Sequence, residues 1–261
     1  MDISIAGKTA VICGSTQGIG FAAAKELAAL GANCILMARN EGALLTAVSE
    51  LPKVKGQQHD YSIADFSNPQ EVKKAIQVIA GNTKVEILVN NSGGPKPGPV
   101  LEAAADSFEE AFRQHLICNH ILAQAVVPGM KAAGYGRIIN IISTSVKTPL
   151  LNLGVSNTIR LAVASWAKSL SNEIAQYNIT VNNVLPGLTE TARLQGLIKG
   201  MAVSEKRDQQ AIESQLIQSI PMKRFGSPAE IANVIGFLAS PAAAYVNGTN
   251  IAVDGGRTPA L

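Results

Sequence analysis

Seven residues near the start of the chain have the types and spacing to bind a phosphate group. They are Gly14, Ser15, Thr16, Gln17, Gly18, Ile19 and Gly20, between a short apolar run and an alanine-rich run with a helical pattern. Three glycines at this spacing let backbone amides close around a pyrophosphate at a helix N-terminus, where unsatisfied N–H groups and the helix dipole favour an anion. Because a β-like run precedes the glycines and a helix follows, the sequence predicts a nucleotide-binding loop rather than a plain glycine turn.

The elements that must position this loop alternate between strand and helix patterns along most of the chain. Apolar, β-prone runs occupy residues 9–13, 34–37, 59–63, 86–89, 137–142, 179–185 and 250–253. Helix boundary signals lie between them: Gly31 after the first helix, Asn68-Pro69 at the start of another, and a capping box at Ser227-Pro228-Ala229-Glu230. The pattern predicts an α/β fold, a Rossmann-type doubly wound seven-stranded parallel sheet with helices on both faces and ligands at the carboxyl ends of the strands.

The composition limits the classes of protein to consider. With 261 residues, of which 47% are hydrophobic, we expect a single domain over 1–261, with 188–221 as a substrate loop or lid, or else a peripheral helical insertion. The net charge of +3 comes from scattered cations, so the sequence favours a small-molecule partner over nucleic acid.

The cysteines and the hydropathy pattern bear on metal binding and location. Cys13, Cys34 and Cys118 lack metal-ligand spacing, and we expect no metal and three reduced thiols, as in a cytoplasmic protein. No basic leader and no apolar run of bilayer length is present, so neither export nor membrane insertion is predicted.

The end of the second expected strand favours one of the two pyridine nucleotides. In such folds a carboxylate at this point selects a free ribose 2′-hydroxyl, whereas a cation accommodates a 2′-phosphate. The junction reads Met37-Ala38-Arg39-Asn40, with no acid and with Arg39 able to form charge-assisted bonds to a phosphate. We therefore expect NADP(H) rather than NAD(H), with a solvated Arg39 at a helix entry as the alternative.

Together these residues resemble the short-chain dehydrogenase/reductase family over essentially the whole chain, from the glycine loop to Val253-Asp254-Gly255-Gly256. The resemblance implies that Asp65 touches the adenine ring and that the segment Asn90-Asn91-Ser92-Gly93 follows the fourth strand beside the cofactor. It also implies that Pro186, Gly187 and Thr191 position the nicotinamide. Within the family, the chain is most similar to 3-oxoacyl-carrier-protein reductases, a similarity that does not identify its substrate.

The expected catalytic positions depart from the family pattern of Ser, Tyr, Lys and Asn. Ser143 falls on the Ser position, but the family spacing puts Ser156 at the Tyr position, Arg160 at the Lys position and His115 at the Asn position. A serine hydroxyl is a much weaker acid than a phenol and stands on a shorter arm, so Ser156 should not replace the proton donor. Arg160 can still bond the nicotinamide ribose and supply positive charge, but it is a poor proton relay.

Two other residues could donate the proton. His115 has a side chain suited to proton transfer near neutral pH, or is a hydrogen-bonded packing residue. Lys147, four residues after Ser143, could protonate an alkoxide, or is a solvated loop lysine.

The sequence leaves three functions open. The first is an NADP(H)-dependent oxidoreductase that acts on a carbonyl or alcohol substrate through an atypical active site. The second is a nucleotide-binding protein with little redox turnover, a sensor or partner subunit, and the third is an enzyme of non-redox chemistry.

The resemblance also implies a homo-oligomer, a tetramer or dimer paired through helices at about 106–133 and 156–176. The apolar stripe of Ile159, Val163, Trp166 and Leu170 would fit such an interface, or else belongs to the core.

Overall fold

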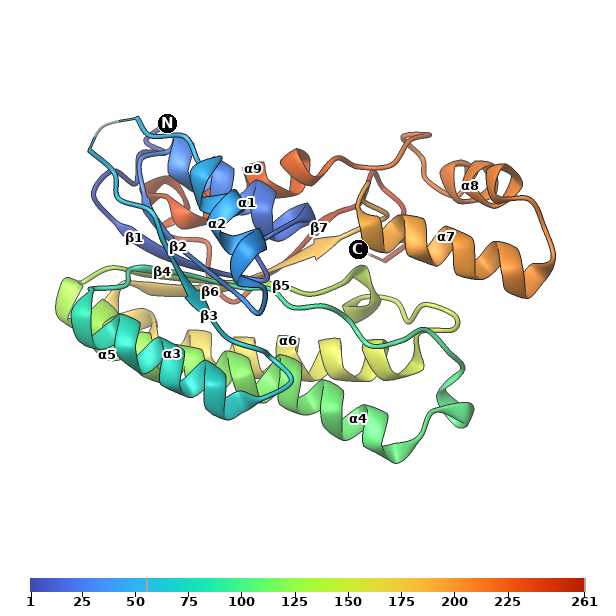
Figure 1. Ribbon diagram of the computed structural model, residues 1–261, viewed down its shortest axis with the longest axis horizontal. Coiled ribbons are helices and arrows are strands. Elements are labelled where there is room, and N and C mark those ends of the chain that lie inside the picture. The colour runs from blue at the N-terminus through green and yellow to red at the C-terminus, as the bar shows by residue number, and fades with distance from the viewer. Residues whose placement is uncertain (55, 261) are drawn as a thin grey trace.

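The computed structural model describes residues 1–54 and 56–260, which form one seven-stranded parallel sheet with helices above and below it (Figure 1). The strand order is β3-β2-β1-β4-β5-β6-β7, so the direction of winding reverses between β1 and β4. The strands are β1 (Thr9–Cys13), β2 (Asn33–Ala38), β3 (Asp60–Ile63), β4 (Ile87–Asn90), β5 (Gly136–Ile141), β6 (Ile179–Pro186) and β7 (Asn250–Val253). The expected fold class is confirmed, with strand ends shifted by a residue at several positions.

Three helices cover each face of the sheet. The helices of one face are α1 (Gly18–Ala29), α2 (Glu41–Ser49) and α9 (Pro228–Ala239), and those of the other are α3 (Pro69–Asn82), α5 (Cys118–Ala133) and α6 (Gly154–Ile174). The central strands are buried on both faces, which is why they read as unbroken apolar runs in the sequence. The side chains of successive strand residues therefore pack alternately into two separate cores, one beneath each helical layer.

The predicted helix starts and the cysteines have clear places in this frame. Asn68 caps α3 through its side chain, and Ser227 and Glu230 form the predicted capping box of α9. The three cysteines are free thiols buried in the two cores. Burial raises the pKa of Cys34 and of Cys118 to about 12, so these thiols are inert packing groups.

The long helix expected over 106–133 is interrupted. It consists of α4 (Ala105–Phe112), a π-helical turn η2 (Arg113–Ile117) and α5. A π-helical turn changes the direction of the side chains that follow it and occurs often at functional sites. The other long helix, α6, is followed by a single 3-10 turn at Ala175–Tyr177.

The apolar stripe of α6 lies against the protein itself. Ile159 and Val163 are buried, and Trp166 and Leu170 pack partly buried on the core beneath α5 and α6. The stripe is thus core, and the oligomer expectation gains nothing from it.

A ladder of four asparagine side chains runs across the neighbouring strands β4, β5, β6 and β7. Asn90 donates to Asn140 at 2.8 Å, Asn140 to Asn183 at 2.8 Å, and Asn183 to Asn250 at 2.8 Å. These residues lie opposite one another in register on β4, β5, β6 and β7. The ladder therefore links four neighbouring strands through side-chain hydrogen bonds.

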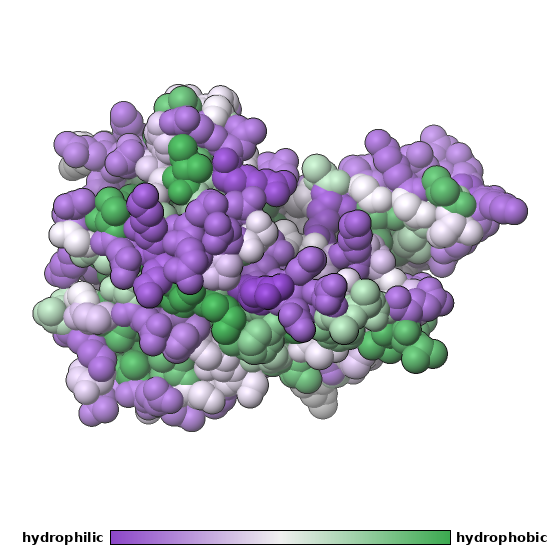
Figure 2. All heavy atoms as spheres, turned by 60° about the horizontal axis from the view of Figure 1, so that its bottom comes forward, coloured by the Kyte–Doolittle hydropathy of each residue, from purple (hydrophilic) through white to green (hydrophobic). Residues whose placement is uncertain are grey.

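The segment 188–221, expected to be a substrate loop or lid or else a peripheral helical insertion, is largely helical, and its role stays a prediction. It contains α7 (Ala192–Glu205) and α8 (Gln209–Gln218), which pack on each other around their own apolar cluster. Figure 1 shows the two helices projecting beyond the end of the sheet, and their outer surface is largely hydrophilic (Figure 2). A parallel bridge between Thr189 and Gly226 holds the two ends of this excursion together.

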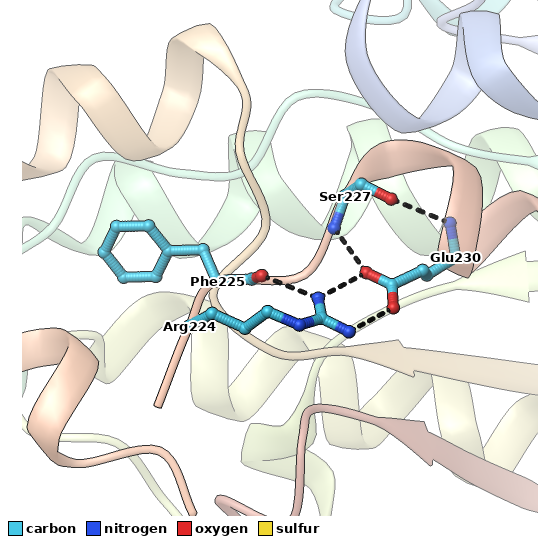
Figure 3. A network of polar contacts seen from close by, with 4 residues as sticks. All are labelled: Arg224, Phe225, Ser227 and Glu230. Carbon is cyan, nitrogen blue, oxygen red and sulfur yellow. Dashed lines mark hydrogen bonds and ion pairs between the residues drawn. The ribbon is translucent and has the colours of Figure 1, made fainter. Parts of the chain in front are cut away.

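The return from the excursion into α9 is fixed by a polar network around one carboxylate (Figure 3). Arg224 donates from its two guanidinium nitrogens to the two oxygens of Glu230, and the backbone N–H of Ser227 donates to the same carboxylate at 2.8 Å. These bonds lower the pKa of Glu230 to about 2. The ion pair between Arg224 and Glu230 therefore fixes the C-terminal end of the α7–α8 unit to the start of α9.

In residues 1–54 and 56–260 no helix has the length and hydropathy of a membrane span.

Candidate active site

The glycine loop follows β1 at the point where the sheet reverses its winding. Gly14 and Gly18 both have a φ of +56°, a left-handed conformation that side chains rarely adopt. A Cβ atom at Gly20 would overlap the carbonyl oxygen of Gly14 and lie 2.7 Å from Asn91 Nδ2. The loop is thus a tight backbone turn in which each of the three glycines has its own steric reason.

The N-terminus of α1 is open to an anion. Gln17 is its N-cap residue and makes no side-chain capping bond, so the first amides of the helix have no side-chain acceptor. The hydroxyl of Ser15 is buried and has no hydrogen-bond partner in the described part of the chain. An uncapped helix with an orphaned hydroxyl beside it fits a phosphate group, since each would gain an acceptor. Thr16 lies half-buried between these groups, and Ile19 packs on the core.

The residue after β2 is an exposed cation, Arg39. The side chain of Arg39 is 78% exposed, and its Nη1 lies 3.8 Å from Asp65 Oδ2. Asp65 accepts the backbone N–H of Ser67 at 2.9 Å, a bond that lowers the pKa of its carboxyl, and the charge of Arg39 adds to this. Arg39 and Asp65 therefore lie together at the ends of β2 and β3, where the sequence placed the ribose and the adenine of the nucleotide.

The loop after β4 supports the glycine turn. Asn91 Nδ2 donates to the carbonyl oxygens of Gly14 at 3.0 Å and of Cys13 at 3.3 Å, so its amide fixes the backbone of the phosphate loop. Ser92 follows, with Gly93 exposed beside it. The segment predicted to lie beside the cofactor thus also supports the glycine loop, through the hydrogen bonds of Asn91.

His115 lies in the π-helical turn and faces Ser92. Its Nδ1 is 2.7 Å from the Ser92 hydroxyl, its Nε2 has no partner among the described residues, and the residue is only 2% exposed. Burial, with added repulsion from Arg160 and Arg193, lowers its pKa from 6.5 to about 2. His115 is therefore a neutral imidazole at physiological pH, and its role in proton transfer stays a prediction.

Ser143 and Lys147 follow β5. The Ser143 hydroxyl accepts the backbone N–H of Ser145 at 3.1 Å and caps a 3-10 turn, Thr144–Val146. Lys147 is the half-buried residue that ends this turn. Ser143 therefore stands at the carboxyl end of a central strand with its hydroxyl hydrogen free to donate.

Ser156 and Arg160 share one face of α6, a helical turn apart, and both are buried. Arg160 Nη1 donates to the carbonyl oxygen of Ile141, the last residue of β5, at 3.0 Å. Burial and then the charge of Arg193 lower the pKa of Arg160 to about 10, so the guanidinium stays positive at neutral pH. The structure thus brings a buried positive charge to the strand that leads to Ser143.

The segment after β6 closes the site from the other side. Gly187 donates its N–H to Val253 at 3.0 Å, and a Cβ atom on it would lie 2.6 Å from Asp254 Cβ. Thr191 caps α7, and its methyl carbon would lie 3.3 Å from a Cβ atom at Gly18. Pro186, Gly187 and Thr191 therefore connect the sheet edge, the glycine loop and the α7–α8 unit.

No tyrosine reaches this site. Three of the four precede strands, at the opposite end of the sheet, namely Tyr135, Tyr177 and Tyr245. The fourth, Tyr61, lies in β3 and donates its hydroxyl to Glu41 at 3.0 Å.

Sequence reasoning missed one functional candidate, Arg193. This residue stands in the first turn of α7, and its guanidinium donates to the carbonyl oxygens of Gly94 at 3.1 Å and Pro95 at 3.4 Å. It therefore connects the α7–α8 unit to the loop after β4. Its position two residues after Thr191 was the one signal in the sequence that could have found it.

A parallel sheet of this order with a glycine cradle at its reversal point defines a dinucleotide-binding α/β fold. The model of the family described as enoyl-(acyl carrier protein) reductase matches residues 14–258. The tropinone reductase homolog At2g30670 of Arabidopsis thaliana is 34% identical over 257 residues, 98% of this chain and 94% of that protein. The 3-oxoacyl-[acyl-carrier-protein] reductase FabG of Vibrio harveyi is 32% identical over 256 residues, with 97% and 98% covered.

Among solved structures, L-sorbose reductase from Gluconobacter frateurii, complexed with NADPH and L-sorbose, superposes with a TM-score of 0.93 at 33% identity, with 100% of both chains covered. The chain belongs to the short-chain dehydrogenase/reductase family.

Proposed function

We propose that the chain is an NADP(H)-dependent oxidoreductase that interconverts a carbonyl compound and an alcohol. The observation that carries the proposal is the phosphate cradle: three sterically required glycines, an uncapped helix and the orphaned Ser15 hydroxyl. Arg39 supports NADP(H) over NAD(H), because it is exposed, β2 ends without an acidic residue, and its ion pair with Asp65 is long, at 3.8 Å. The NADPH in the L-sorbose reductase structure supports the same cofactor.

The cofactor would be held along the carboxyl edge of the sheet. Its pyrophosphate fits the amides of residues 14–20, its 2′-phosphate fits Arg39, and its adenine fits the side of Asp65. The segment Asn91-Ser92-Gly93 and the residues Pro186, Gly187 and Thr191 would border the nicotinamide half, with Arg160 beneath it. When bound, NADPH supplies a hydride to a carbonyl carbon.

The residues of the chain would then act on the carbonyl oxygen. Ser143 donates a hydrogen bond that polarises it, and the Arg160 guanidinium stabilises the negative charge that develops there. Neither Ser156, an alcohol, nor His115, with a pKa of about 2, carries a proton that is acidic near pH 7. The proton therefore comes from Lys147 or from water, and the absence of a matched general acid lowers the rate by roughly 10²- to 10⁴-fold.

Turnover assays test this proposal directly. NADPH oxidation is followed by absorbance with a panel of ketones, sugars and 3-oxoacyl thioesters. Ser143→Ala should lower kcat by roughly 10²- to 10³-fold with little change in NADPH affinity. Lys147→Gln should remove turnover if the lysine is the donor and leave it unchanged if water is. Turnover that is equal in wild type and Ser143→Ala would contradict the proposed site.

A second function is a nucleotide-binding sensor or partner subunit with little redox turnover. It is favoured by one observation, that no tyrosine of the described chain lies at the carboxyl edge of the sheet. Tight NADPH binding with no oxidation across the whole panel would establish this function and exclude the first.

We further propose that the chain forms a homo-oligomer and works in the cytoplasm. Exposed apolar side chains lie around α4 and α6, where Figure 2 shows apolar patches on a mostly hydrophilic surface; they are Leu101, Phe112, Leu151 and Leu161. Three free cysteines fit a reducing compartment. Light scattering on the eluting protein measures the mass, and a monomer would contradict the first of these proposals.

A further inference from the structure

Two arginines converge on the site without a carboxylate to balance them. Arg160 is 8% exposed, and its one hydrogen bond within the described chain goes to the carbonyl oxygen of Ile141. No Asp or Glu of residues 1–54 and 56–260 forms an ion pair with Arg160 or with Arg193. A buried guanidinium without a counterion is costly, and a bound anion removes that cost.

Arg193 comes from a different element, the first turn of α7, and lies on the loop after β4. It packs against the backbone so closely that a Cβ atom at Gly94 would lie 2.8 Å from its Cζ. Its two bonds to Gly94 and Pro95 leave other N–H donors of the guanidinium unused. Its charge reaches both His115 and Arg160, since it lowers the pKa of each.

His115 adds an unused polar atom at the same place. Its Nδ1 is bonded to Ser92, and its Nε2 is buried without a partner although the residue is 98% enclosed. In the tautomer that accepts the Ser92 hydroxyl hydrogen at Nδ1, Nε2 carries a hydrogen that can be donated. His115 and Arg193 thus both bond to the loop after β4, and the charges of Arg160 and Arg193 both act on His115. Each of the three residues has at least one N–H without an acceptor in the described chain.

We propose that Arg160, Arg193 and His115 bind the carboxylate of an oxo acid, which is the substrate class of the reaction proposed above; the inference rests on that function. Arg160 is bonded to Ile141, two residues before Ser143, so its charge lies near the residue proposed to polarise the carbonyl, as an oxo acid with neighbouring carbonyl and carboxylate groups requires. A phosphate of the cofactor is the other source of an anion. It is disfavoured because the glycine loop, Ser15 and the N-terminus of α1 already provide donors for the pyrophosphate.

Malonate, which carries carboxylates but no ketone, is the probe. It is titrated calorimetrically into the chain alone and into the chain saturated with NADPH. We expect binding to both, loss of at least about tenfold in affinity in Arg193→Gln and in Arg160→Gln, and no binding of dimethyl malonate. Arg207→Gln is the matched control, because Arg207 is a cation of the same α7–α8 unit that is paired with Glu205 at 2.9 Å.

Arg193→Gln alone keeps the test valid if Arg160→Gln does not fold, because Arg193 is exposed at the cleft surface. No malonate binding to the wild type, or equal binding by wild type and Arg193→Gln, overturns the inference. So does competition between malonate and NADPH together with a tenfold loss of NADPH affinity in Arg193→Gln, since the arginines would then hold a cofactor phosphate.

Kinetics separate this inference from the function on which it rests. With NADPH, Arg193→Gln should raise KM for 2-oxobutyrate or 3-oxobutyrate at least about tenfold and leave KM for the corresponding methyl ester unchanged. Malonate binding without oxidation of NADPH by any carbonyl would refute the redox function and keep the anion site. Oxidation that is as fast with esters as with acids, in wild type and variant alike, would keep the function and refute the acid substrate.

Discussion

The neutral, buried imidazole of His115 makes the stability of the protein depend on pH. In the unfolded chain this histidine titrates with a pKa of about 6.5, whereas in the folded chain its pKa is about 2. Below pH 6.5 the unfolded state therefore binds a proton that the folded state does not. Stability falls as the pH falls, with a slope that approaches about 1.4 kcal/mol per pH unit.

The size of the effect follows from these two values. At pH 8 the imidazole is neutral in both states, and the linkage contributes almost nothing. At pH 5 the unfolded histidine is about 97% protonated, which favours unfolding by about 2 kcal/mol. Carboxylates with a lowered pKa, such as Asp65 and Asp254, lose their contribution to stability only at still lower pH. They therefore add little to the change in stability between pH 8 and pH 5.

Urea unfolding at pH 8 and pH 5 measures the prediction, at fixed protein concentration and without NADPH. His115→Asn should lose about 2 kcal/mol less than the wild type between the two values, because an amide does not titrate. The exposed His120→Asn is the matched control and should keep the loss of the wild type. An NMR titration in which the His115 ring becomes protonated above pH 5, or equal losses in wild type and His115→Asn, would refute the reasoning.

Three further substitutions test other parts of the structure. Gly20→Ala should abolish NADPH binding measured by fluorescence, because its Cβ would displace Gly14 or Asn91; unchanged affinity would show that the loop is not the cradle. Asn140→Leu should lower the free energy of unfolding by about 2–4 kcal/mol, since it leaves the amide nitrogen of Asn90 and the amide oxygen of Asn183 without their partners; a loss below about 1 kcal/mol would mean that the asparagine ladder is not stabilising. Ser227→Ala should cost about 1 kcal/mol in the same assay through the lost cap of α9, and no loss would assign the anchoring to the Arg224–Glu230 pair.

The fold was accessible from the sequence because its signals are local. A strand buried on both faces must be largely apolar. A glycine loop between a strand and a helix can be recognised from about twenty consecutive residues. The capping box of α9 is likewise contained in four consecutive residues, Ser227 to Glu230. These features depend on near neighbours and hardly at all on the rest of the chain.

The features that escaped prediction depend on distant pairings. The asparagine ladder depends on the register of neighbouring strands, because its three hydrogen bonds join residues that are separated by 50, 43 and 67 positions in the sequence. The π-helical turn at Arg113–Ile117 leaves the helical pattern of the sequence almost unchanged. The apolar faces of α7 and α8 pack mainly against each other. Arg193 becomes part of the site only through contacts with carbonyl oxygens 98 and 99 residues away.

We infer that a phosphorylated dinucleotide binds at the carboxyl edge of the sheet and that Arg39 distinguishes NADPH from NADH. The purified chain is titrated with NADPH and with NADH, and binding is followed by fluorescence. NADPH should bind at least about tenfold more tightly than NADH, and Arg39→Gln should remove most of this difference. No binding of either nucleotide, or binding of NADH as tight as that of NADPH, would contradict it.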